Sequence, residues 1–147
     1  MSSEGLFVGS RASMLLHLLP FRRSHPEAMD EADGGWIDAE VSVAAGAFRG
    51  EYVACLRAEE FVRFRQDLER LYRELRGSGS FHSTEGWVTV EVTGDGQGHF
   101  AGRCRASDAA GDGNVLEGEL AFDQTDLPAM IEALRAIERA FPSQTGR

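Results

Sequence analysis

The segment Asn114–Phe141, NVLEGELAFDQTDLPAMIEALRAIERAF, contains a complete strand–turn–helix unit. Apolar or small residues alternate with charged ones over Leu116–Asp123, and this period of two predicts a strand with one buried side. Thr125 or Asp126 is placed to cap a following helix, and Pro128 falls in its first turn, where a missing N–H costs nothing. Apolar residues then recur at steps of three and four, as on an amphipathic helix: Leu127, Met130, Ile131, Leu134, Ile137 and Phe141.

A second segment, Ala47–Leu75, follows the same plan. Gly50-Glu51-Tyr52 in its strand corresponds to Gly118-Glu119-Leu120 in the later strand. Its apolar helix residues have the same relative spacing as those of the later helix: Phe61, Phe64, Leu68, Leu71 and Leu75. Either one strand–helix unit was duplicated, or two unrelated strands each precede a core helix; two copies are too few for a solenoid.

The remaining patterns predict the bounds of the first helix, one loop and six further strands. The helix after Ala47–Leu56 is expected to run from Ala58 to Arg76 and to end at Gly77-Ser78-Gly79-Ser80, and residues 22–35 are expected to form a loop. The other expected strands are Leu6–Gly9, Ser13–Phe21, Trp36–Val43, Phe81–Ser83, Trp87–Thr93 and Phe100–Ala106. Ala44-Ala45-Gly46 is a short hairpin turn, which makes its flanking strands antiparallel. The predicted class is α+β: an antiparallel sheet of about six to eight strands with two amphipathic helices on one face, in the order strands, helix, strands, helix.

Composition limits the classes of protein that the chain can represent. The 147 residues are expected to form a single domain, 1–147, with residues 1–5 and 143–147 frayed. The formal net charge is −9, and no basic patch is long enough to follow a phosphate backbone, so nucleic acid is not an expected partner. An acidic chain attracts a basic partner.

The two cysteines indicate a reducing, cytoplasmic setting. Cys55 falls on the solvent-facing side of its strand and Cys104 on the buried side, so the two thiols are not expected to meet. The apolar run Met14–Leu19 is too short to span a membrane, and it lacks the flanking features of a signal peptide.

Motifs that carry chemistry are weak in this sequence. Gly94–Gly98 contains Gly-x-Gly-x-Gly, but a strand follows it, so a hairpin turn is expected in place of a phosphate loop. Asp108–Asn114 lacks the ligand spacing of a calcium loop, and the four histidines are dispersed. Glu117 and Glu119 share one strand face and are expected to be solvated. We therefore predict no catalytic residue, no metal site and no cofactor.

One group of charged residues has a functional interpretation. By alternation these residues lie on the solvent-facing side of the predicted strands: Asp38, Glu40, Glu51, Glu91, Arg103, Arg105, Glu117 and Glu119. Trp36 or Trp87 is placed at the border of this face. The face is either merely solvated or a docking surface that attracts a basic partner by complementary charge.

Five sequence pieces together resemble the WapI-like immunity proteins and related bacterial domains. They are GWIDAEV at 35–41, GAFRGE at 46–51, EGW at 85–87, GDGQGH at 94–99 and LEGELAFDQTDL at 116–127. The likeness extends from Leu6 to Phe141 and is sharpest at Phe122–Leu127. These pieces mark strand ends and a helix cap, so they indicate a fold. The resemblance implies a protein that neutralises a cognate toxin, often a nuclease, and it implies no catalytic residues.

The sequence thus favours a non-catalytic protein that binds another protein, with a basic toxin domain as the expected partner. The chain is expected to be a monomer or a homodimer and to bind neither nucleic acid nor membrane. An alternative from another class is a small-molecule-binding module or an enzyme, with its site between the sheet and the loops Arg22–Gly35 and Ser107–Gly113. A pocket lined by convergent polar groups would favour that alternative. A homodimer formed through the open sheet face is a third interpretation.

Overall fold

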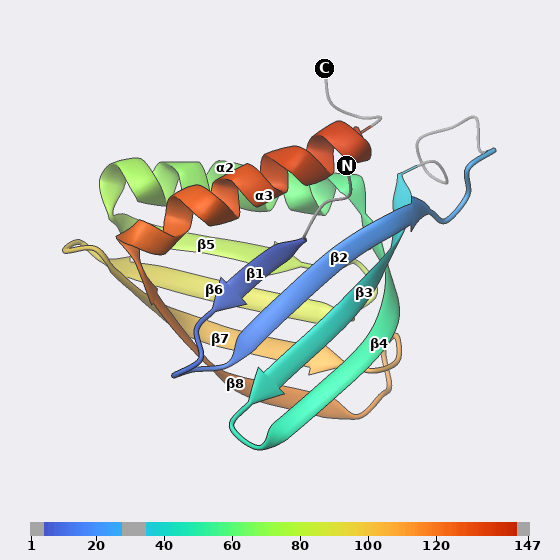
Figure 1. Ribbon diagram of the computed structural model, residues 1–147, viewed down its shortest axis with the longest axis horizontal. Helices are drawn as coiled ribbons and strands as arrows, with labels where there is room; N and C mark the ends of the chain where they lie inside the picture. Colours follow the sequence, from blue (N-terminus) through green and yellow to red (C-terminus); the bar gives the residue numbers. More distant parts are fainter. Residues whose placement is uncertain (1–4, 28–34, 144–147) are drawn as a thin grey trace.

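The computed structural model describes residues 5–27 and 35–143, and this part of the chain forms eight antiparallel strands and two long helices (Figure 1). The first sheet has the order β1-β2-β3-β4, with β1 Leu6–Gly9, β2 Leu15–Arg23, β3 Trp36–Ala45 and β4 Phe48–Arg57. The second has the order β5-β6-β7-β8, with β5 Arg76–His82, β6 Val88–Asp95, β7 His99–Ser107 and β8 Val115–Asp123. Helix α2 is Ala58–Glu74, η1 is Gln124–Asp126 and α3 is Leu127–Ala140.

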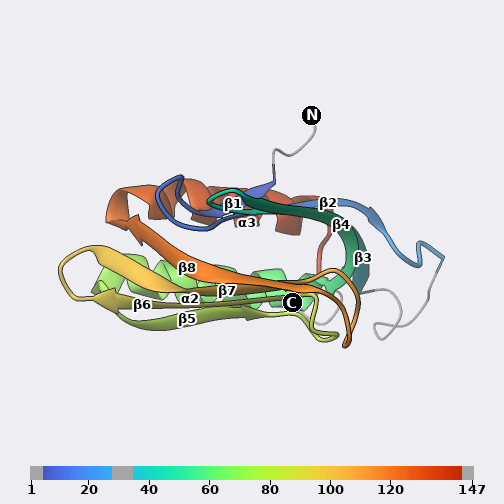
Figure 2. The ribbon, with the colours of Figure 1, turned by 90° about the horizontal axis from the view of Figure 1, so that it is seen from below.

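The α+β class and the order strands, helix, strands, helix are confirmed. Each half of the chain is a four-stranded meander followed by a helix. The strands are divided between two sheets, whereas the sequence analysis treated them as one. Figure 2 shows the sheets as two layers, with α3 at the level of the first and α2 at the level of the second. The period of two identifies the buried side of a strand and does not identify its neighbours, so it could not reveal this division.

A single hydrophobic core lies between the two layers and under the helices. Alternate residues of both sheets point into it, and the two helices contribute their apolar stripes. The ring of Phe81 on β5 contacts two rings of α2, with centroid distances of 5.1 Å to Phe61 and 6.0 Å to Phe64. Burying one such aromatic side chain stabilises a fold by roughly 1.5–3 kcal/mol. The helices also pack on each other, α2 beside β5 and α3 beside β1.

The end of α2 differs from the sequence prediction. The helix stops at Glu74. The Leu75 N–H still donates to the carbonyl of Leu71, and the left-handed conformation of Leu75, with φ 60°, then turns the chain away from the helix. The Gly-Ser run that was expected only to end the helix is part of strand β5. Glycine is depleted in strands, and this hid the strand in the sequence. At Gly79 an added Cβ would lie 3.0 Å from the Cβ of Asp67, so glycine lets α2 approach closely.

The residue that caps the start of the last helical segment differs from the prediction. Capping by Thr125 or Asp126 was expected, but the carboxylate of Asp123 accepts the hydrogen bond from the Thr125 N–H at 2.9 Å and caps the 3-10 turn η1. Asp126 reciprocates by accepting from the Asp123 N–H at 3.0 Å and makes no side-chain bond that caps α3 itself. Pro128 lies in the first turn of α3, as predicted.

The two glycine-containing hairpins are confirmed. Gly46 and Ala47 form the turn between β3 and β4, one residue later than predicted, and Gly46 has a φ of +61°. Between β6 and β7 the Asp95 carboxylate accepts hydrogen bonds from the N–H groups of Gln97 and His99, at 2.7 and 3.1 Å. The expected loop at 22–35 begins later than predicted, since β2 continues to Arg23. Residues 28–34 lie outside the described residues, and so do 1–4 and 144–147, which are all but one residue of each predicted frayed end, 1–5 and 143–147.

Glu60 is a buried carboxylate that holds the start of α2, with only 4% of its surface exposed. Its Oε1 accepts from the Arg57 N–H at 2.9 Å. Its Oε2 accepts from the N–H and the hydroxyl of Thr84, at 2.7 and 2.6 Å. Glu60 thus joins α2 to the β5–β6 connection. Burial raises the pKa of Glu60, and the hydrogen bonds from Arg57 and Thr84 oppose this only in part.

We predict that Glu60→Gln changes the pH dependence of stability. Because the folded-state pKa of Glu60 lies above its unfolded value, the native state binds more protons between the two values. The contribution of this carboxyl to stability is complete below its unfolded pKa and is lost as pH rises through its folded pKa. The free energy of unfolding of the wild type, relative to Glu60→Gln, should therefore fall as pH rises from about 4 to 7.

Urea unfolding of both proteins across that pH range measures the difference. Glu74→Gln is the matched control, because it removes an exposed carboxylate from the same helix. A difference between wild type and Glu60→Gln that does not change with pH would contradict the prediction.

Candidate functional site

The structure divides the eight residues of the predicted charged face between two surfaces. Asp38, Glu40 and Glu51 lie on the outer face of the first sheet. The other five lie on the outer face of the second sheet: Glu91, Arg103, Arg105, Glu117 and Glu119. The core lies between the two sheets, so these faces point away from each other (Figure 2). Each face is therefore assessed separately as a docking surface.

On the first sheet, Asp38 is already engaged by its neighbours. Its carboxylate accepts from the Nε of Arg22 at 2.7 Å and from the hydroxyl of Ser24 at 2.6 Å. Burial alone would raise the pKa of Asp38, but these two hydrogen bonds outweigh it and lower the pKa. The Ser24 hydroxyl is also 3.2 Å from the Sγ of Cys55. Asp38 therefore orders the end of β2 against β3.

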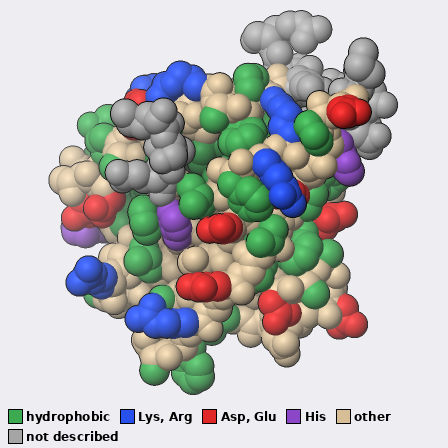
Figure 3. Space-filling model, turned by 45° about the vertical axis from the view of Figure 1, so that its right-hand side comes forward, with side chains coloured by type: hydrophobic (Ala, Val, Ile, Leu, Met, Phe, Trp, Pro, Cys, Tyr) green, Lys and Arg blue, Asp and Glu red, His purple; other side chains and the backbone are tan. Residues whose placement is uncertain are grey.

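The rest of the first-sheet outer face mixes apolar and charged side chains. Phe7 is 51% exposed and stacks on His17 with a centroid distance of 4.1 Å, and Val53 is exposed further across the sheet. Its three carboxylates are matched by three arginines on the same strands: Arg22, Arg49 and Arg57. In Figure 3, which brings the side of β3 and β4 forward, acidic, basic and apolar side chains are interspersed. This face has no excess of either charge.

The outer face of the second sheet is acidic. We call it the second-sheet face and define it by its outward charged residues: Glu91, Asp95, Glu117, Glu119 and Asp123, with Arg76, Arg103 and Arg105. Five carboxylates therefore face three guanidinium groups. The alternation that identified five of these residues also places Asp95 and Asp123 at the strand ends. Arg76 joins them only because β5 begins where the sequence predicted the end of a helix.

The two arginine–glutamate pairs between β7 and β8 on the second-sheet face are loose, whereas the Nε2 of His82 on β5 lies 3.2 Å from the Oε2 of Glu91 on β6. Arg103 lies in register between Glu91 and Glu119, and its Nη1 is 4.0 Å from the Glu119 Oε2. Arg105 lies opposite Glu117, with 3.9 Å between Nε and Oε2. The Glu119 side chain is 86% exposed. Exposed ion pairs of this kind contribute about 0–1 kcal/mol, so a partner can replace them at little cost.

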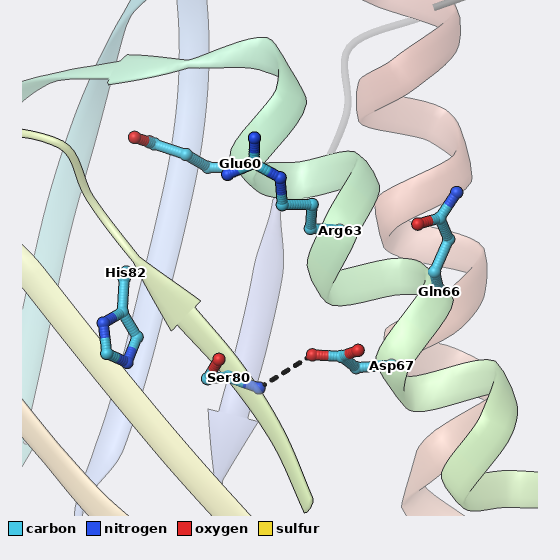
Figure 4. Close-up of a pocket in the computed structure, with 6 residues that line it drawn as sticks. All are labelled: Glu60, Arg63, Gln66, Asp67, Ser80 and His82. Atoms are coloured by element: carbon cyan, nitrogen blue, oxygen red, sulfur yellow. Dashed lines mark hydrogen bonds between the residues drawn. The ribbon is translucent and has the colours of Figure 1, made fainter.

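A groove between α2 and β5 adjoins this face (Figure 4). It has a volume of about 230 Å³ and is lined by Glu60, Arg63, Gln66, Asp67, Ser80 and His82. The Asp67 side chain points across it to the backbone of Ser80, and the Asp67 Oδ2 accepts from the Ser80 N–H at 3.0 Å. A second hollow of about 330 Å³ shares Asp67 and Ser80 and reaches Glu91. The groove is thus continuous with the second-sheet face.

The contacts across the groove also cover the free edge of β5. Asp67 accepts from the backbone of Ser80, and the Arg70 guanidinium donates to the carbonyl of Ser78. An uncovered strand edge exposes unpaired N–H and C=O groups to other chains. Neither contact is predictable from the sequence pattern, because the Gly-Ser run is typical of a helix end and indicates no strand beside α2.

The loop Ser107–Gly113, one of the two proposed to border a small-molecule site, is held by hydrogen bonds between its own ends. The Asp108 carboxylate accepts from the backbone N–H and the side-chain amide of Asn114, at 2.8 and 3.1 Å. These hydrogen bonds lower the pKa of Asp108. The other loop of that alternative includes 28–34, which lie outside the described residues. Across residues 5–27 and 35–143 no group of three or more His, Cys, Asp or Glu side chains is arranged to hold a metal ion.

The cysteines and tryptophans occupy separate environments. Cys55 is half-buried on the outer side of β4, and Cys104 is buried in the core, as the alternation predicted; both are free thiols. Burial raises the pKa of Cys104 to about 12. Trp36 lies on the first-sheet outer face under the Arg57 guanidinium. Trp87 instead stacks on Tyr52 between the sheets, and its carbonyl accepts from the Tyr52 hydroxyl at 2.8 Å.

The geometry defines a two-sheet α+β protein with an acidic, solvent-exposed sheet face. The chain belongs to the WapI-like immunity protein family: the family described as "Immunity protein WapI-like family" matches residues 8–142. This confirms the resemblance found in the sequence, and membership implies a protein toxin as the partner. None of the helices in the described part of the chain has the length and apolar character needed to cross a membrane.

Two solved structures are similar to the chain. The chain is similar to the plant transcriptional regulator PBF-2, with a TM-score of 0.51 and 15% identity, over 92% of this chain and 82% of that one. It is also similar to Trypanosoma brucei MRP1/MRP2, with a TM-score of 0.48, 15% identity and the same coverage. At this identity the first likeness concerns the fold alone. No curated protein matches the chain in sequence.

We predict that Asp67→Ala uncovers the edge of β5. The Ser80 N–H would lose its charged acceptor, which should lower the free energy of unfolding by about 1–3 kcal/mol and speed hydrogen exchange at the Ser80 amide. Asp67→Asn is the matched control, because its amide oxygen can still accept. NMR hydrogen exchange combined with urea unfolding measures both effects. Unchanged protection of Ser80 in Asp67→Ala would contradict this role.

Proposed function

We propose that this protein is an immunity protein that binds a cognate toxin domain through the second-sheet face and blocks the toxin by covering its working surface. The family match over residues 8–142 carries the proposal. The chain then acts by binding, and no catalytic step is part of its action. A basic, nucleic-acid-binding surface on the toxin is the chemistry that an acidic face complements.

The charge distribution favours the second-sheet face over the outer face of the first sheet. Five carboxylates against three arginines give the second-sheet face a net negative charge, whereas the first-sheet face is balanced. The net charge of −9 adds a longer-range attraction for a basic partner. Complementary charge of this kind raises the association rate more than it raises the affinity.

The size of the surface sets a further requirement. Four strands about 4.8 Å apart and about eight residues long cover roughly 500 Å² of flat area. A stable protein–protein interface buries roughly 800 Å² on each partner. A toxin bound to this face would therefore extend onto a neighbouring surface. The α2–β5 groove supports this extension, since it shares Asp67 and Ser80 with the hollow that reaches Glu91.

The first test of the function is protection. Co-expression with the toxin domain encoded beside this protein should restore growth of the host cell, and the two proteins should co-purify as a stoichiometric, salt-sensitive complex. A host that dies despite soluble expression of this protein, with no complex formed, would contradict the immunity function.

The second test addresses the face. Reversing charge with Glu117→Lys and Glu119→Lys should slow association with the toxin by about tenfold or more at low salt and weaken the salt dependence of the rate. Stopped-flow association rates at low and high salt measure this.

Glu27→Lys with Glu40→Lys is the matched control, because it makes the same change in net charge outside the second-sheet face. Equal slowing by the two double variants would assign the effect to overall charge and remove the second-sheet face from the proposal.

A further inference from the structure

The two sheets have four edge strands, and three of them are covered. Side chains of α2 cover β5. The connection between β1 and β2 reaches β8, where the Met14 N–H donates to the Glu119 carbonyl at 2.8 Å. Strand β1 has four residues and packs beside α3. Strand β4, with ten residues, is the long edge strand that remains.

The outward backbone groups of β4 can be assigned from its hairpin. The two-residue turn makes Ala45 and Phe48 a hydrogen-bonded pair, and hydrogen-bonded pairs then recur at every second residue. Gly50 therefore bonds to β3, whereas Arg49 and Glu51 direct their N–H and C=O groups to the open edge. Among the described residues, these outward groups have no backbone partner.

The side chains on this edge are also unpaired. Arg49 and Glu51 are exposed on the outer side of β4, and neither has an ion-pair partner within residues 5–27 and 35–143. On the inner side, Phe48 is 71% exposed. A hollow of about 190 Å³ lies along this edge, lined by Arg49, Glu51 and Tyr52 of β4 and by Leu116 of β8. An exposed apolar side chain beside an open edge is a feature that proteins usually avoid unless it is covered.

We propose that β4 pairs antiparallel with β4 of a second copy of this chain, about a two-fold axis at Gly50. In this register Arg49 lies opposite Glu51 of the second copy, and Glu51 lies opposite Arg49 of the second copy. Residues with outward backbone groups face each other, so the ladder bonds form. Phe48 lies opposite Tyr52 of the second copy and next to the hollow. The two first sheets then form one continuous eight-stranded sheet.

Neighbouring registers are less complementary. An axis at Glu51 puts two carboxylates directly opposite each other, and like charges in that position are destabilising. An axis at Tyr52 puts Glu51 opposite Val53 and Arg49 opposite Cys55, so neither charge has a partner. The pairing about Gly50 is the one of these three that matches charge with charge. It uses no residue of the second-sheet face, so toxin binding and strand pairing can fail independently.

A charge-swap experiment tests the register. Sedimentation equilibrium of the wild type should give twice the chain mass of 16.1 kDa. Arg49→Glu and Glu51→Arg should each weaken the dimer by about tenfold or more, because each puts like charges opposite one another. The double variant, Arg49→Glu with Glu51→Arg, should restore the dimer to within about threefold of wild type. Circular dichroism confirms that each variant is folded.

A cysteine placed on the axis gives a second readout. Residues facing each other in a non-hydrogen-bonded pair have Cα atoms about 4.5 Å apart, which lies within the range of a disulfide. Gly50→Cys, made in a Cys55→Ser background, should therefore form a disulfide-linked dimer under mild oxidation. Val53→Cys in the same background is the matched control, because it is exposed on the same strand but lies away from the axis, and it should not cross-link.

Three outcomes would overturn the proposal. The first is a wild-type chain that stays monomeric up to about millimolar concentration. The second is a dimer that is insensitive to both single charge variants and is not linked through Gly50→Cys, which would place the interface elsewhere. The third is a monomer whose β4 amides become protected from exchange only in complex with the toxin, which would assign this edge to a strand of the toxin.

Discussion

The packing of α2 along the edge of β5 is the contact on which the rest of the structure depends. This packing requires an apolar contact and a short distance between helix and strand. Phe81 of β5 packs against the rings of Phe61 and Phe64 on α2, and Gly79 lets the helix come near the strand. Asp67 and Arg70 bond to backbone groups of this edge, and β4 and β5 lie at the edges of different sheets. The strands therefore form two layers that bury their inner sides against each other.

That division determines the electrostatics of the surface. Once two layers share a core, every charged residue on an outer side must face one of two opposite directions. The first layer receives as many carboxylates as arginines, and the second receives an excess of carboxylates. Glu117 and Glu119 of the second layer are exposed and lie 3.9 and 4.0 Å from their arginine partners, so little free energy is needed to redirect them to a binding partner.

The edge strands of the two sheets affect both the stability of the chain and its association with other chains. The chain covers one long edge with helix side chains, one with a connecting loop and one by keeping the strand short. Strand β4 has no such cover among the described residues, and it carries one free cation, one free anion and an exposed aromatic ring within four positions. Open edges favour aggregation unless a specific pairing satisfies them. A self-complementary edge and an acidic face on the other layer would let one small chain form a dimer and bind a toxin at the same time.

The sequence by itself determined the local structure and the class. The period of two identified the buried side of most strands, the glycine hairpins and the helix stripe of Leu127–Phe141 were evident, and the family was recognisable from short motifs. The hairpins also identified two pairs of neighbouring strands, but only the tertiary structure decided how the eight strands divide between two sheets. It placed Glu40 and Glu119 on opposite sides, made strand β5 from a Gly-Ser run and put Trp87 between the layers. The physical reason is that alternation records whether a side chain meets water, whereas the pairing of strand edges depends on contacts between residues far apart in the chain.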